Sequence, residues 1–149
     1  MKYIKVNGTE LQCARICTRM YFTISKLNYT STEKYHFFNI DDEMLYISKY
    51  ADFGPLNLGH VFNYVKKVDR KLQSKMLRNK CIIHIASGRT KQWTNAAFLA
   101  AAYRTIKLHK NPEAAVAPLA VFKRKLRSFT VGDRKYKLSI QDFMEGLSK

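Results

Sequence analysis

One stretch of this sequence, a short apolar run followed by a small-residue loop and an apolar helix, constrains the fold most. Residues 81–85 are mainly apolar and stand between charged residues, which is typical of a central parallel strand covered on both faces. Residues 86–91 are small or polar and predict a loop. Residues 93–108 are apolar almost all round and predict a buried helix. A strand that leads through a loop into a buried helix predicts an α/β fold with a central sheet.

A second helix is predicted where large apolar residues recur at helical spacing. These residues share one face at 3.6 residues per turn, and they are Leu58, Val61, Phe62, Val65, Val68 and Leu72. Pro55, directly after Gly54, is suited to the first turn of such a helix. The basic residues of the same segment are predicted to point away from the apolar face: Lys66, Lys67, Arg70 and Lys71.

The rest of the chain shows weaker patterns. Three segments with aromatic and β-branched residues are strand candidates: residues 20–27, 35–40 and 44–50. Asn111, as an N-cap before Pro112, predicts a short helix that Pro118 ends or kinks. Residues 129–131 are predicted to be extended, and residues 139–147 to form a final helix.

The length and composition fit one intracellular globular domain. With 149 residues, 46% of them hydrophobic, the chain can bury one core. We expect residues 1–19 to be an N-terminal extension and residues 20–149 to be a single domain. The sequence has no apolar run of about 18 residues and no signal-peptide pattern at its start, so neither a membrane span nor secretion is expected. Three cysteines, an odd number, are typical of a reducing compartment, and we expect a nuclear or cytoplasmic location.

Positive charge is concentrated in two stretches. The chain has 27 Lys and Arg against 11 Asp and Glu, a formal net charge of +16. Residues 63–91 hold nine basic side chains against Asp69, and residues 123–137 hold seven against Asp133. Such a field attracts polyanions, although a solvated lysine surface gives the same pattern. One short basic run also fits a nuclear import signal: Lys123, Arg124, Lys125 and Arg127.

The predicted loop after the central strand has the place of an anion-binding site. The unpaired N–H groups and the dipole at a helix N-terminus favour a phosphate there. The loop resembles the phosphate loop of tyrosine and dual-specificity phosphatases, which has the pattern His-Cys-x-x-Gly-x-x-Arg. His84 and Gly88 match this pattern, whereas Ile85 stands at the Cys and Lys91 at the Arg. The resemblance marks a degenerate phosphate loop made of His84, Ile85, Ala86, Ser87, Gly88, Arg89, Thr90 and Lys91.

These two departures remove the chemistry that the resemblance would imply. The Cys must ionise and attack phosphorus, and Ile85 has no nucleophilic atom. The Arg holds two phosphate oxygens, whereas Lys91 is only a point charge. Asp52 stands 33 residues before position 85, near the place of the family's general acid, and is a relic of that role. Ser87 has no base nearby in the sequence, so we expect no catalytic residue and no hydrolysis by this chain alone.

Three further segments make the resemblance closer. Residues 35–43, 50–58 and 95–99 resemble the N-terminal half of the cell-division-cycle-fourteen dual-specificity phosphatases, and the similarity runs from about residue 20 to residue 147. The resemblance implies a phosphatase-like sheet flanked by helices that has lost catalysis and packs against a catalytic half outside this chain. Together the two halves of that family build a groove for phosphoserine followed by proline. We therefore expect a role in substrate recognition or docking, with a catalytic domain or phosphoproteins as partners.

Alternatives stay open for the partner and for the loop. The chain could instead be a binding module for phosphoproteins or nucleic acid that uses the basic patch of Lys66, Lys67, Arg70, Lys71, Lys123, Arg124, Lys125 and Arg127. The loop could be a weak anion site or an empty relic. Cys13 and Cys17 have no second close pair that would complete a zinc site, so neither a metal nor a cofactor is expected.

Overall fold

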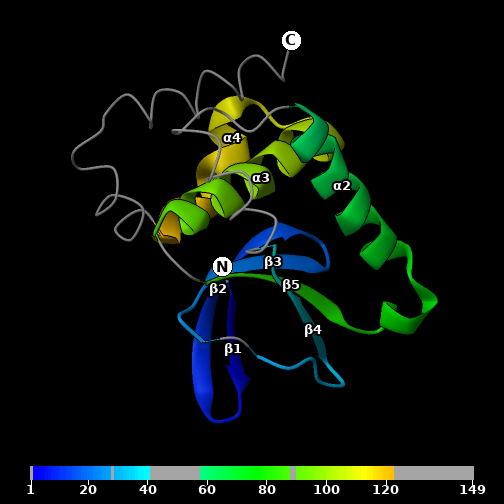
Figure 1. Cartoon of the computed structure of the whole chain (residues 1–149), viewed down its shortest axis with the longest axis vertical. Helices are drawn as coiled ribbons and strands as arrows, with labels where there is room; N and C mark the ends of the chain where they lie inside the picture. Colours follow the sequence, from blue (N-terminus) through cyan, green and yellow to red (C-terminus); the bar gives the residue numbers. More distant parts are fainter. Residues whose placement is uncertain (1, 28, 41–57, 88–89, 123–149) are drawn as a thin grey trace.

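A five-stranded mixed sheet in the order β1-β2-β3-β5-β4 organises the chain, and α-helices cover one of its faces (Figure 1). The structure is a computed structural model that describes residues 2–27, 29–40, 58–87 and 90–122. The strands are β1 (Lys2–Val6), β2 (Thr9–Cys17), β3 (Met20–Ile24), β4 (Tyr35–Phe38) and β5 (Cys81–Ala86). The helices are α2 (Leu58–Gln73), α3 (Thr90–Leu108) and α4 (Pro112–Val116), with the short 3-10 helices η1 (Lys75–Leu77) and η2 (Ala117–Phe122). The predicted single α/β domain with a central sheet is confirmed.

β5 is the central parallel strand that the sequence predicts. It pairs in parallel with β3 on one side and with β4 on the other. His84 lies opposite Phe22 of β3 and Phe38 of β4. The strand ends at Ala86, one residue later than predicted, and the strands predicted over 20–27 and 35–40 are each shorter in the structure.

An N-terminal hairpin extends the sheet through residues to which the sequence analysis assigned no strand. β1 and β2 are antiparallel, with Val6 opposite Thr9, so only Asn7 and Gly8 form the turn. Both have positive φ, 50° and 80°, which is the conformation of the two-residue hairpin turns that favour Asn-Gly. β2 then pairs antiparallel with β3. The Asn-Gly pair between alternating apolar residues was the available signal for this hairpin.

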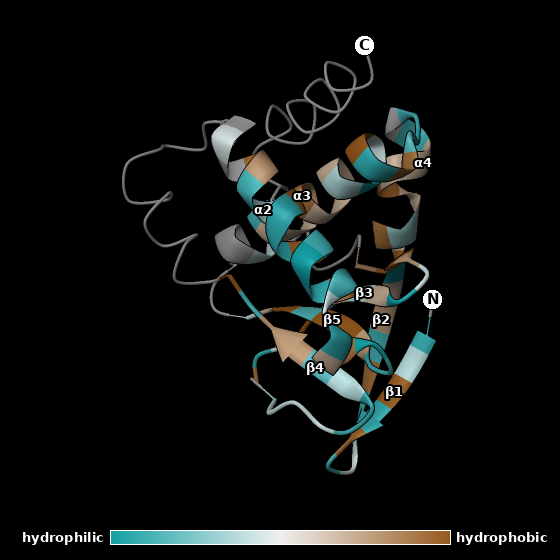
Figure 2. Ribbon diagram, turned by 90° about the vertical axis from the view of Figure 1, so that its right-hand side faces the viewer, coloured by the Kyte–Doolittle hydropathy of each residue, from teal (hydrophilic) through white to brown (hydrophobic). Residues whose placement is uncertain are grey.

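Side chains on the two faces of the sheet belong to two separate buried clusters. The cluster under the helices joins strand residues such as Phe22 and Ile82 to apolar residues of α2 and α3. The cluster on the opposite face joins Ile83 and Ile85 to residues of β1, β2, β3 and β4. This alternation along β5 follows the two-residue period of a strand. Figure 2 shows hydrophobic residues along β5, while much of α2 is hydrophilic.

α2 is confirmed, but its inner face is rotated from the predicted one. Val61, Val65 and Val68 are buried as predicted, whereas Phe62 is 48% exposed. Tyr64 is 3% exposed and takes the inner position. Because helix positions seven apart share a face, Lys71 lies on the same side as Tyr64 and is half-buried.

The remaining helices are present as predicted, although α3 is longer at its N-terminus. α3 starts at Thr90, before the predicted Trp93, and its alanine-rich centre is buried all round. The side chain of Asn111 accepts a hydrogen bond from the N–H of Ala114 at 2.8 Å, so the predicted N-cap of α4 is confirmed. α4 gives way to η2, which contains Pro118. The predictions over residues 44–50, 129–131 and 139–147 lie outside the described residues.

Arg19, between β2 and β3, fixes the end of α2 to the sheet. Its guanidinium donates to the carbonyl oxygens of Leu72 at 3.1 Å, Leu77 at 2.7 Å and Lys80 at 3.3 Å. The carbonyl of Leu72 lies in the last turn of α2, where carbonyl groups lack helix partners, and those of Leu77 and Lys80 lie between α2 and β5. The Arg19 side chain thereby fixes the basic segment of residues 75–80, between α2 and β5, to the sheet. None of the described helices is long and apolar enough to cross a membrane.

Candidate functional site

The junction between β5 and α3 is the place that the sequence assigned to the degenerate phosphate loop. β5 ends at Ala86 and α3 begins at Thr90, so the predicted strand and the helix that follows it are confirmed. Gly88 and Arg89 lie outside the described residues, as does Asp52. Lys91 lies in the first turn of α3 rather than in the loop.

The position of the family's nucleophile is occupied by a core residue. Ile85 is 2% exposed and belongs to the buried cluster on the sheet face opposite the helices. Tyr21 and Phe37 from the neighbouring strands are in the same cluster. The hydrocarbon at this position therefore contributes to packing and offers no atom for chemistry.

His84 is a buried neutral imidazole. It is fully buried, and its Nδ1 atom lies 2.8 Å from the hydroxyl of Tyr64. Its ring stacks on Phe38 at 4.9 Å and meets the edge of Phe22 at 5.2 Å. Burial, with a smaller effect of Lys67, lowers the pKa of His84 to about 3. The residue is consequently a structural member of the core near neutral pH.

His84 does not act as a base toward Ser87. Ser87 is 5% exposed, and the Nε2 atom of His84 has no hydrogen-bond partner within the described part of the chain. A nucleophilic serine needs an adjacent base within hydrogen-bond distance. The neighbouring imidazole nitrogen thus does not activate Ser87.

A polar network between α2 and α3 occupies the carboxylate of Asp69. The hydroxyl of Tyr103 donates to Asp69 at 3.0 Å, and Lys107 forms an ion pair with the same carboxylate at 3.0 Å. Burial raises the pKa of the Tyr103 hydroxyl, and the neighbouring Cys17 and Asp69 raise it further. Tyr64, with its pKa also raised by burial, completes a set of phenols that stay protonated. These groups join the helices and do not form an acid–base pair.

The basic patch predicted on α2 is only partly a solvated surface. Lys66 and Arg70 are exposed, and Lys67 is half-buried. Lys71 departs from the prediction that it points away: its Nζ atom lies 4.9 Å above the Phe38 ring and 2.8 Å from Nε2 of His36. The rotated inner face of α2 brings this side chain over β4. The other half of the predicted patch, residues 123–127, lies outside the described residues.

The cluster around His36 is the feature that sequence reasoning missed. The sequence placed His36 in a strand and Lys71 on a helix, and their separation of 35 residues leaves no local signal. The His36 ring stacks on Phe38 at 6.4 Å. Only the packing of α2 on β4 brings the three side chains together.

Two of the cysteines, Cys13 and Cys17, lie in β2 and are poor nucleophiles. Cys13 is fully buried, and burial raises the pKa of its thiol to about 11. Burial also raises the pKa of Cys17. Across residues that the structure describes, no three His, Cys, Asp or Glu side chains gather where they could hold a metal ion.

The sequence matches one protein family over most of its length. The family described as "Dual specificity protein phosphatase, N-terminal half" matches residues 14–149. The chain is 38% identical over 141 residues to a mouse protein named "Dual specificity protein phosphatase CDC14A", and this covers 92% of the chain. The chain belongs to the N-terminal half of the CDC14-type dual specificity phosphatases. The resemblance seen in the sequence is therefore confirmed.

Relatives occur in animals and fungi, and all are longer than this chain. A human CDC14A is 38% identical over 92% of the chain. A fission yeast protein named "Tyrosine-protein phosphatase CDC14 homolog" is 36% identical over 85% of the chain. The matched region spans about a quarter of these relatives, namely 23% of the mouse protein and 26% of the fission yeast protein.

Proposed function

We propose that this chain is a non-catalytic half of a CDC14-type phosphatase that serves in phosphoprotein recognition and docks against a catalytic domain. The observation that carries the proposal is the burial of Ile85, 2% exposed, at the nucleophile position. Its burial in a cluster formed by the strands means that a substrate phosphate could not reach it. The family's phosphatase activity would then reside in a catalytic domain outside this chain.

Activity measurements test the catalytic part of this proposal. The purified chain is expected to hydrolyse neither an aryl phosphate nor a phosphotyrosine peptide. Ser87→Ala serves as the matched variant, because it removes the hydroxyl that lies closest in the sequence to the nucleophile position, Ile85. Turnover that follows the purified chain and survives Ser87→Ala would reject the proposal.

Binding measurements test the docking part. A catalytic domain from a CDC14-type relative, mixed with this chain, is expected to form a complex that sediments as one species. The complex is also expected to dephosphorylate a phosphoserine-proline peptide with a lower KM than the catalytic domain alone. Independent sedimentation together with an unchanged KM would exclude docking.

A second candidate function is binding of a nucleic acid by the basic surface. Residues 66–80 carry seven basic side chains against Asp69, which is already paired with Lys107. Binding of this kind falls linearly in log affinity against log salt concentration. A duplex or single-stranded oligonucleotide that shows no binding in 20 mM salt would remove this candidate.

A further inference from the structure

Lys71 and His36 form a contact between two basic side chains. The Nζ atom of Lys71 lies 2.8 Å from the Nε2 atom of His36. An ammonium group can only donate, so Nε2 must be the acceptor, and the proton of the neutral ring is on Nδ1. Protonation of His36 would place two cations at hydrogen-bond distance with nothing between them. Within the residues that the structure describes, no carboxylate forms an ion pair with Lys71 or His36.

Two more cations face this pair from neighbouring segments. Burial, then Lys71 and Lys80, lowers the pKa of His36. Burial, then Lys67 one helical turn away, lowers the pKa of Lys71. Lys80 directly precedes β5, and the next residue, Cys81, pairs with Tyr35 of β4. α2 and the residue before β5 therefore bring positive charge to the region where His36 of β4 lies.

No carboxylate of the described residues is among the groups that shift these two pKa values. The acidic residue nearest in the helix, Asp69, pairs with Lys107 and accepts from Tyr103 on the side toward α3. The Nζ atom of Lys71 lies over the Phe38 ring, and the His36 ring lies beside that ring and nearly parallel to it. The surface around His36 and Lys71 consequently combines positive charge, partial burial and a neighbouring aromatic ring.

We propose that His36, Lys71 and Lys80 bind the phosphate group of a phosphorylated protein side chain. A phosphomonoester brings a charge of about −1.5 to −2 and three acceptor oxygens near pH 7. It would accept from the ammonium groups, and protonation of His36 would add a further charge-assisted hydrogen bond. These basic groups come from β4, α2 and the residue before β5 and lie in one region, which suits a single phosphate better than the extended backbone of a nucleic acid. The inference rests on the proposed function, since it assigns the phosphoprotein a site.

Nuclear magnetic resonance of the whole chain tests this site directly. The probes are a ten-residue peptide with one phosphoserine, the same peptide without phosphate, and inorganic phosphate. The phosphopeptide is expected to move the His36 ring signals and to raise the pKa of His36, because a bound anion favours the imidazolium. The unphosphorylated peptide is expected to leave both unchanged.

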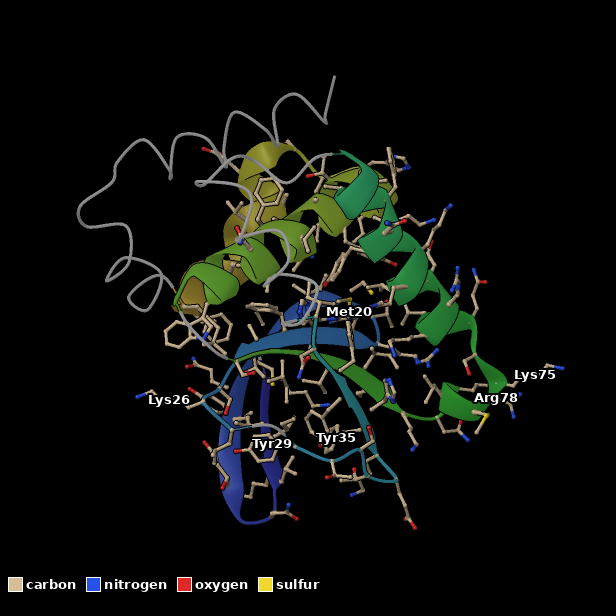
Figure 3. All side chains as sticks on the ribbon, in the orientation of Figure 1. Met20, Lys26, Tyr29, Tyr35, Lys75 and Arg78 are labelled. Carbon is tan, nitrogen blue, oxygen red and sulfur yellow. The ribbon has the colours of Figure 1, made fainter. Side chains whose placement is uncertain are left out.

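Charge-removing variants separate a site from a general field. Lys71→Gln is expected to weaken phosphopeptide binding about tenfold, and Lys80→Gln to weaken it in the same direction. Lys26→Gln is the matched control: it removes one charge at an exposed lysine on the opposite side of the molecule from Lys75 and Arg78 (Figure 3). Lys80→Gln keeps the test valid if Lys71→Gln does not fold.

The outcomes distinguish this site from the proposed function. Equal phosphopeptide affinity of Lys71→Gln, Lys80→Gln and Lys26→Gln would overturn the site, while complex formation with a catalytic domain would still support the proposed function. Inorganic phosphate that binds as tightly as the phosphopeptide would overturn the assignment to a phosphoprotein. An oligonucleotide that binds more tightly than the phosphopeptide at 150 mM salt, roughly physiological, would overturn it in favour of nucleic acid.

Discussion

The side chain of Ile85 lies in the same buried cluster as Cys13, on the sheet face opposite the helices. Cys13 shows what this environment does to sulfur, because burial raises the pKa of its thiol to about 11. A thiol with that pKa is ionised to only about one part in ten thousand at pH 7. The thiolate is the nucleophile, so the location of position 85 opposes catalysis independently of the residue type.

Ile85→Cys is therefore expected to restore no phosphatase activity. The variant is expected to be less stable by about 1–2 kcal/mol, since it loses buried hydrocarbon. Its new thiol is expected to resist alkylation at pH 7 as strongly as Cys13. Aryl phosphate turnover, iodoacetamide labelling and chemical unfolding measure the three effects. Turnover by Ile85→Cys, with none by the parent chain, would show that position 85 reaches substrate.

His84 is expected to make the fold sensitive to acid. Its pKa is about 3 in the folded chain against 6.5 when unperturbed. Above pH 6.5 the ring is neutral in both states and contributes no pH dependence. Below 6.5 the unfolded chain binds a proton that the folded chain excludes, so stability falls by up to about 1.4 kcal/mol per pH unit until the folded pKa is reached.

Chemical unfolding between pH 7 and pH 5, in the chain and in His84→Gln, isolates this contribution. The lowered pKa of His36 adds a loss of the same sign, and this share is common to both proteins. The variant is expected to have the shallower pH dependence. Slopes that agree within error would mean that His84 is charged in the folded chain or excluded from the core.

At the level of elements, α2 is held to the sheet by a narrow stripe of residues. Val68 is completely buried and Phe62, on the neighbouring side of the helix, is 48% exposed. Val68→Ala is expected to destabilise the fold by about 2 kcal/mol, because it removes two buried carbon atoms. Phe62→Ser, although a larger chemical change, is expected to alter stability by less than about 0.5 kcal/mol. Urea unfolding of both variants measures the difference. A larger loss of stability in Phe62→Ser than in Val68→Ala would mean that Phe62 is buried, as the sequence predicted.

Periodicity predicted the elements whose pattern is local. The apolar spacing in α2, the apolar run of β5 and the alanine-rich centre of α3 each depend on neighbours within a few turns. The β1–β2 hairpin was also encoded locally, in Asn7 and Gly8 between alternating residues. The apolar periodicity alone did not predict this hairpin, whose signal is the preference of Asn-Gly for a two-residue turn.

Contacts between distant elements could not be predicted in the same way. Tyr64 turns inward because its hydroxyl meets His84, which lies 20 residues away on the central strand. This rotation carries Lys71 over Phe38 and next to His36. A helical pattern fixes which residues share a face, but the partner on the sheet decides which face is buried. The contact of Lys71 with His36 and Phe38 therefore could not be predicted from the sequence alone.

The whole molecule carries a net charge of +16 with cations gathered at one corner. Lys75 and Arg78 project into solvent beyond the end of α2 (Figure 3), close to the segment that Arg19 fixes through the carbonyl of Leu77. Repulsion among like charges disfavours a compact chain. The sheet and its two buried clusters must offset this repulsion when no anion is bound.

Added salt is consequently expected to stabilise this protein. Between 20 and 300 mM sodium chloride, screening weakens the repulsion, and the melting temperature is expected to rise by several degrees. The half-exposed ion pair of Lys107 and Asp69 changes in the opposite direction, but such pairs contribute only about 0–1 kcal/mol. The matched variant is Lys66→Glu with Arg70→Glu, which reverses two exposed charges on α2 and should have the shallower salt dependence. A melting temperature that falls with salt, measured by calorimetry, would mean that ion pairs outweigh repulsion in the folded chain.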